Sequence, residues 1–149
     1  MYHGIVRRKL YQAFDQLNRG DYDSILKPFA PRFEHFFSGE HALGGTRHTM
    51  DACQRWYDRL ARVFPDLRFR VRRVIVTGWP WDTQAIVEWT DHATVRGQPY
   101  SNEGVHVFRL RWGRLVELHI YCDTAKLIDG LNGQAEHGIS EAVAGPIND

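Results

Sequence analysis

The spacing of apolar residues changes once along the chain, from a helical period to a strictly alternating one. In the first part, apolar residues recur every three or four positions over 5–17 and over 49–64, which predicts two amphipathic helices. Between them, Asp21 is suited to begin a short second helix, and 31–37 alternates like a strand. Pro65 ends the helix before it because a proline ring cannot continue a helix.

Beyond this proline, apolar residues alternate with polar ones, which is typical of strands with one buried face. Four strands are predicted, over 67–77, 83–95, 102–111 and 115–122. They are separated by a turn at 78–82, a loop at 96–101 and a two-residue turn at Trp112-Gly113. Because helices come first and hairpin-linked strands follow, the order predicts an α+β fold with a mostly antiparallel sheet.

The end of the sequence carries no periodic stripe. A short helix is predicted over 124–131, and the segment that follows is rich in Gly, Ala and Asn. We therefore expect a single domain over 1–131 and a flexible C-terminal tail over 132–149. A length of 149 residues fits one domain of this kind.

Composition narrows the classes of partner. The formal net charge is +1, so no overall field favours nucleic acid or an anionic membrane. No stretch approaches the ~18 apolar residues of a membrane span, and the N-terminus lacks the pattern of a signal peptide. The two cysteines, Cys53 and Cys122, have no metal-site spacing. We expect a cytoplasmic protein that binds neither nucleic acid nor membrane, and no glycine-rich loop predicts a nucleotide cofactor.

Two stretches carry a resemblance to a known family. One is Phe14–Phe29, in which a helix runs into Asn18-Arg19-Gly20-Asp21, and the other is Gly113–His119, the turn into the last strand. With the helix and strands between them, they resemble the SnoaL-like, ketosteroid-isomerase-like branch of the NTF2-like superfamily over about Val6–Leu131. The resemblance implies a cone in which a curved sheet wraps around helix 49–64 and encloses one small-molecule pocket. It implies no single activity, since the superfamily holds isomerases, aldol cyclases, epoxide hydrolases and non-catalytic binders.

Strand parity singles out two histidines. In strand 102–111, His106 lies on the face opposite Arg109 and Arg111, and charged arginines belong outside, so His106 is expected to point inward. A tight turn at Trp112-Gly113 would place His106 directly opposite His119 of the last strand. Two histidines facing each other in an apolar cavity would titrate as a coupled pair and could act as acid and base. The alternative is one core histidine and one exposed histidine.

Three further polar residues accompany this pair. The resemblance suggests Asp123 as an acid–base residue, because polyketide cyclases have a similarly placed acid, but Asp123 also stands where it would cap the helix over 124–131. Tyr121 shares the predicted inward face and is either a hydrogen-bond donor in the pocket or part of the core. Asn102 could donate to a ligand carbonyl or cap the preceding loop.

Aromatic residues are the remaining candidates. His35, between Phe33 and Phe37, is either a pocket wall or a satisfied core histidine. Substrate contacts are also expected from Trp56, Trp89 and Phe108, although aromatic stripes often belong to plain core. No metal site is predicted, because His35, His106 and His119 come from three distant segments.

Taken as function, these residues favour a cofactor-free acid–base enzyme of isomerase, cyclase or hydratase type. Its substrate would be a small apolar carbonyl or polyketide-like compound, with His106, His119, Tyr121 and Asp123 as catalytic residues. The alternatives are a non-catalytic binder of a small molecule and a protein-interaction subunit. A homodimer through the outer face of the sheet is expected, because Val105 and Val107 would lie there.

Overall fold

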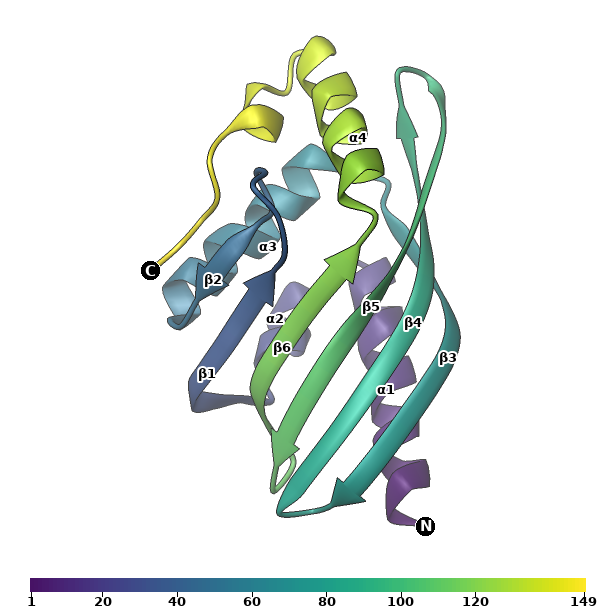
Figure 1. Ribbon diagram of the computed structural model, residues 1–149, viewed down its shortest axis with the longest axis vertical. Coiled ribbons are helices and arrows are strands. Elements are labelled where there is room, and N and C mark those ends of the chain that lie inside the picture. The colour runs from purple at the N-terminus through teal and green to yellow at the C-terminus, as the bar shows by residue number, and fades with distance from the viewer.

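The computed structural model describes residues 1–149 as an α+β fold, a curved six-stranded sheet with helices on one face. Figure 1 shows α1 (Tyr2–Asn18), α2 (Tyr22–Leu26) and α3 (Met50–Val63) behind the sheet, whose other face is left uncovered. The fold class predicted from the sequence is confirmed. None of the helices combines the length and the hydrophobicity that spanning a membrane would require.

The strands lie in the order β2-β1-β6-β5-β4-β3. Their bounds are β1 Phe29–Phe37, β2 Gly45–Arg47, β3 Arg68–Trp79, β4 Asp82–Val95, β5 Gln98–Arg111 and β6 Arg114–Cys122. All neighbours are antiparallel except β1 and β6, which pair in parallel. The short strand β2 lies within a stretch whose glycines and histidines predict a loop, and it adds an edge to the sheet that periodicity did not indicate.

Two of the helices begin at residues whose side chains cap the first turn. Thr49 accepts a hydrogen bond from the Ala52 N–H at the start of α3, and Asp21 accepts one from Ser24 at the start of α2. The buried stripe of α1 has the predicted members, Val6, Leu10, Phe14 and Leu17. The buried residues of α1 and α3 form one hydrophobic core with the inner residues of β3–β6.

Two hairpins close in two-residue turns, at 96–97 and 112–113. All four φ angles there are positive, between 51° and 76°, as in a type I′ turn. The segment 96–101 is therefore not the predicted loop, because β5 already begins at Gln98 and pairs with the end of β4.

A β-bulge in β6 reverses the faces predicted for this strand. Leu110 pairs with Leu115, but Arg109 pairs with Glu117, which leaves Val116 as an extra residue. Each position beyond the bulge is therefore shifted by one. His106 lies opposite Ile120, and not opposite His119 as the simple turn predicted.

The C-terminal segment is packed on the domain, which differs from the predicted flexible tail. α4 (Thr124–Glu136) runs further than expected, and a short 3-10 helix, η1 (Ser140–Val143), follows. Figure 1 shows the chain returning beside α3 and β2. The buried Ile147 gives its carbonyl to the Arg47 guanidinium at 2.8 Å, and the Asp149 carboxylate accepts the backbone N–H groups of His48 and Thr49 at 2.6 and 2.9 Å. The partners are about 100 positions apart, so local periodicity could not reveal these contacts.

Candidate functional site

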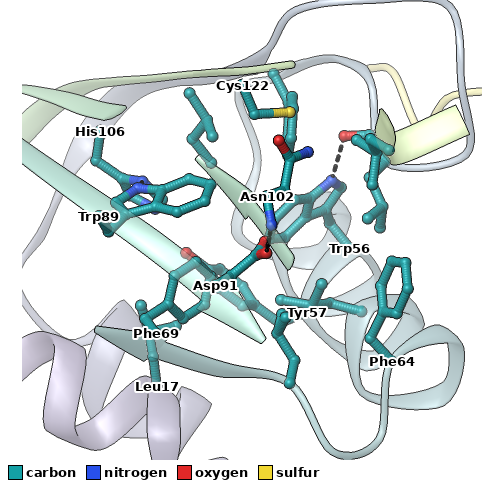
Figure 2. A pocket seen from close by; sticks show the side chains of 16 residues that line it. Leu17, Trp56, Tyr57, Phe64, Phe69, Trp89, Asp91, Asn102, His106 and Cys122 are labelled. Atoms are coloured by element: carbon teal, nitrogen blue, oxygen red, sulfur yellow. Dashed lines mark hydrogen bonds between the residues drawn. The ribbon is translucent and has the colours of Figure 1, made fainter. Parts of the chain in front are cut away.

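A cavity of about 40 Å³ lies between α3 and the inner face of the sheet. Thirteen of its sixteen lining residues are hydrophobic, and the others are Asp91, Asn102 and His106. Figure 2 shows these three polar side chains among the aromatic rings of α3 and β4. A few polar groups among apolar side chains is the usual composition of a small-molecule site, but a space of this volume can hold only the reacting end of a ligand.

Asp91 is a buried carboxyl on β4, with 8% of its surface exposed. One oxygen accepts the backbone N–H of Asn102 at 2.8 Å, which holds the carboxyl toward the cavity (Figure 2). Burial raises the pKa of Asp91 to about 6, and the hydrogen bond from Asn102 opposes this shift only in part. Near neutral pH the group can therefore take up and return a proton.

His106 is held as a neutral ring. Burial lowers its pKa to about 3, so the imidazole does not become charged at neutral pH. The indole Nε1–H of Trp89 donates to Nδ1 of His106 at 2.8 Å. Because Nδ1 accepts this bond, the single proton of the neutral ring is on Nε2. His106 is thus a fixed hydrogen-bond donor and a poor base.

Tyr57 obtains its orientation from a buried chain of polar groups. The Arg47 Nε–H donates to Nδ1 of His35 at 3.0 Å, and Nε2 of His35 lies 3.4 Å from the Tyr57 hydroxyl. Burial holds the pKa of His35 well below its usual value, so His35 is neutral and donates its Nε2 proton toward Tyr57. Burial also raises the pKa of Tyr57, which stays protonated and keeps its own proton for another acceptor.

The side chain of Asn102 is held by hydrogen bonds to its neighbours. Its side-chain amide donates to the Asp123 carbonyl at 3.0 Å and to the Tyr100 hydroxyl at 3.3 Å, and its oxygen accepts the Glu103 N–H at 2.8 Å. These bonds occupy both N–H groups of the amide, so the side chain has no free donor for a ligand carbonyl. They hold Asn102 in place, and its backbone N–H is the group that orients Asp91.

A second, larger cavity lies between α1 and the sheet. Its volume is about 210 Å³, and its lining includes Phe108 together with Leu10, Ala13 and other apolar residues of α1. His106, Tyr57 and Leu17 line both cavities and so form the boundary between them.

The predicted histidine pair does not exist. The bulge at Val116 turns His119 to the outer face, where its Nε2 lies 2.6 Å from the carboxylate of Glu34 on β1. Tyr121 points to the same outer face, is 42% exposed, and packs against Phe36. Neither residue lines the two inner cavities, so an acid–base role for them in this site is excluded by position.

Asp123 caps α4, which is the structural one of the two roles predicted for it. Its side chain accepts the N–H of Lys126 at 3.2 Å at the first turn of the helix. It does not line the inner cavities.

The predicted substrate-contact residues separate into two groups. Trp56, Trp89 and Asn102 line the smaller cavity, and Phe108 lines the larger one. His35 is fully buried and lines neither, because Arg47, Trp56 and Tyr57 enclose it.

Asp91 and Tyr57 are the site residues that strand and helix reasoning missed. In strand 83–95 every second residue from Ala85 to Val95 is apolar except Asp91, so an acid on an apolar face was a readable signal. Tyr57 was assigned to the stripe of its helix, and nothing in the sequence distinguished its hydroxyl from a core position. No three His, Cys, Asp or Glu side chains are gathered so that they could hold a metal ion.

The sequence profile of the SnoaL-like domain matches residues 9–118. A search of curated proteins finds no significant match. Among solved structures, an NTF2-like protein of unknown function from Burkholderia pseudomallei is 23% identical, with a TM-score of 0.73 over 83% of this chain and 95% of that one.

Two other similar structures are described by a putative activity or by a bound compound. IdmH, a putative polyketide cyclase from Streptomyces antibioticus, is 18% identical with a TM-score of 0.69, over 85% of this chain and 97% of that one. TerC, crystallised with polyporic acid, is 20% identical with a TM-score of 0.68, over 81% and 93% of the two chains. At these identities the similarity establishes the fold.

Proposed function

The chain belongs to the SnoaL-like domain family, and from this premise we propose that it is a cofactor-free acid–base enzyme acting on a small, largely apolar carbonyl compound. The observation that carries the proposal is the combination in one cavity wall of a carboxyl with a pKa of about 6 and two neutral donors, His106 and Tyr57. Perturbed carboxyls that face a cavity are typical of catalytic positions.

The mechanism assigns each group one task. Asp91, as the carboxylate, removes a proton from the carbon next to the substrate carbonyl, and the electron pair moves onto the carbonyl oxygen. The resulting enolate oxygen accepts hydrogen bonds from Nε2–H of His106 and from the Tyr57 hydroxyl. Asp91 then returns the proton to the product, which makes the reaction an isomerisation or, if the enolate attacks a second carbonyl, a cyclisation.

The surroundings favour this chemistry. Exclusion of water strengthens the two hydrogen bonds to a developing oxyanion, and neutral donors do not compete with Asp91 for its charge. Trp89 and His35 are positioning residues, because Trp89 fixes the tautomer of His106 and His35 fixes the orientation of Tyr57, and neither takes part as an acid or base. The similar structures IdmH, a putative polyketide cyclase, and TerC, crystallised with polyporic acid, are consistent with a polyketide-like substrate class.

Exchange of substrate α-protons with solvent deuterium, followed by NMR, tests the proposal directly. In a panel of enolisable apolar ketones and 1,3-diketones, the protein should accelerate exchange for at least one. Asp91→Asn should lower that rate by about 10²-fold or more, and His106→Gln or Tyr57→Phe by about 10- to 10³-fold. Glu88→Gln is the matched control, because Glu88 is a carboxylate of the same strand on the outer face. Exchange that Asp91→Asn leaves unchanged would contradict the mechanism.

A non-catalytic binding protein is the second candidate, and the predominantly apolar lining of the cavity favours it. The two candidates differ in one measurement. A binder would hold an apolar ligand with equal or greater affinity in the Asp91→Asn variant and would accelerate no exchange.

We propose in addition that the protein forms a homodimer through the outer face of the sheet. The support is a row of paired positions across that face, Ile75, Ile86, Val107, His119 and Phe36, of which three are aliphatic and one is aromatic.

A further inference from the structure

The larger cavity, between α1 and the sheet, has no task in the mechanism above. It is about 210 Å³ in volume, and fourteen of its eighteen lining residues are hydrophobic. Protein interiors are normally packed without voids much larger than a water molecule, and an empty apolar cavity destabilises the fold. A space of this size next to the site therefore indicates an occupant.

Helix α1, which covers the cavity, has a small residue at one of its lining positions. The inner stripe of α1 consists of large side chains, Val6, Leu10, Phe14 and Leu17, but Ala13 also lines the cavity and ends at its methyl group. Room for a ligand is thus provided by one small residue among large ones. A bulkier side chain at position 13 would fill it.

The mouth of the cavity is at its exposed lining residues, which include Ile5 and Lys9 of α1 and Gly113 of the β5–β6 turn. Lys9 is the only lining residue with a formal charge at neutral pH, since burial keeps His106 neutral. Its neighbours one turn away on the helix, Ile5 and Ala13, carry no carboxylate, so the ammonium group has no acid beside it on this face.

The opposite end of the cavity is the boundary formed by His106, Tyr57 and Leu17. A ligand that fills the cavity therefore has one end at Lys9 and the other at His106 and Tyr57, the two donors that also line the smaller cavity with Asp91. An engineered apolar cavity of about 150 Å³ accepts benzene, so the present space suits one ring or a short alkyl chain.

We propose that the cavity binds the body of an apolar carboxylic acid, with its ring or chain between α1 and the sheet and its carboxylate on Lys9. The statement that the substrate is such an acid, with its carbonyl beyond His106, rests on the proposed function. Occupation of the cavity by an apolar acid does not require any reaction.

Isothermal titration of the full chain with octanoate, and separately with 1-octanol, tests the proposal. Octanoate should bind with a 1:1 stoichiometry and more tightly than octanol. Lys9→Gln should weaken octanoate about fivefold, the upper end for an exposed ion pair, and leave octanol unchanged. Ala13→Leu should weaken both ligands more than tenfold because it fills the space. Arg8→Gln, an exposed position of α1 that does not line the cavity, is the control and should change neither.

Three results would overturn the proposal: no saturable binding, weakening of both ligands to the same extent by Lys9→Gln, or unchanged binding in a folded Ala13→Leu variant. If Ala13→Leu does not fold, intermolecular NOEs from octanoate to the methyl groups of Leu10 and Leu118 in the unaltered protein decide the location. Asp91→Asn separates this proposal from the proposed reaction, because it should lower the rate of proton exchange by about 10²-fold or more and leave octanoate affinity unchanged.

Discussion

At the scale of single residues, the unusual group is a carboxyl on the apolar face of a strand. Asp91 stands between Trp89 and Ala93 on the inner face of β4, where burial disfavours its charged form. The backbone N–H of Asn102 supplies one hydrogen bond, which is enough to orient the carboxyl but not to restore its ordinary acidity. Burial thus turns a common surface residue into one that titrates near physiological pH.

The raised pKa makes a prediction about stability. The folded pKa of Asp91 is about 6, above the ~3.9 of an unfolded chain. The folded state therefore binds this proton more tightly, so the stabilising contribution is complete below about pH 4 and is lost as the pH rises through 6. Asp91→Asn cannot ionise, and it should become progressively more stable than the unaltered protein, by roughly 2 kcal/mol between pH 4 and pH 7.5.

Urea unfolding of both proteins at several pH values measures this difference. A stability difference between Asp91→Asn and the unaltered protein that stays constant from pH 4 to pH 7.5 would mean that Asp91 has an ordinary pKa.

At the scale of secondary-structure elements, capping and register decide which polar residues reach the site. A single extra residue, Val116, turns His119 and Tyr121 outward and brings Leu118 and Ile120 into the core, where each is 2% exposed. Asp123, the next residue after β6, caps the first turn of α4. Both effects remove predicted catalytic residues from the cavity without altering the fold.

The capping role of Asp123 separates structure from catalysis. Asp123→Ala should lower the free energy of unfolding by about 1 kcal/mol, because the first turn of α4 loses a side-chain acceptor. Asp123→Asn and Asp123→Ser should recover most of this loss, and proton exchange per folded molecule should stay within about twofold in all three variants. Denaturant unfolding and the exchange assay give the two numbers. A stable Asp123→Asn protein with a 10²-fold slower reaction would return Asp123 to the catalytic residues.

At the scale of the whole molecule, the two faces of the sheet have different roles. The inner face holds the core and both cavities under α1 and α3 (Figure 1), whereas the outer face is uncovered and includes Ile75, Ile86 and Tyr121 with 38–43% of their surfaces exposed. Exposed apolar side chains in adjacent strands are typical of an interface.

The proposed dimer predicts a mass of two chains in solution. Multi-angle light scattering at micromolar concentration should give about twice the 17.4 kDa of one chain. Val107→Glu places a charge in the middle of the apolar row and should shift the population to monomers, while Thr94→Glu, at the exposed far end of β4, should not. One-chain mass for the unaltered protein would refute the dimer.

The sequence by itself determined the fold class, the stripes of α1 and α3, the hairpin turn at 112–113 and the inward direction of His106. These follow from local rules: helical and alternating periods, proline and glycine positions, and the preference of charged arginines for solvent. The apolar alternation of β4 also marks Asp91, the one acidic residue on the inner face of that strand.

The tertiary structure alone decided the partners of these residues. Whether His106 is a base or a donor depends on Trp89, which lies on the neighbouring strand, and the orientation of Tyr57 depends on Arg47 through His35. A bulge moves every later residue to the opposite face, yet a periodic pattern with one added residue looks almost the same in the sequence. The pKa values of the site residues depend on burial and on hydrogen bonds between distant segments, and both exist only when the helices are packed on the sheet.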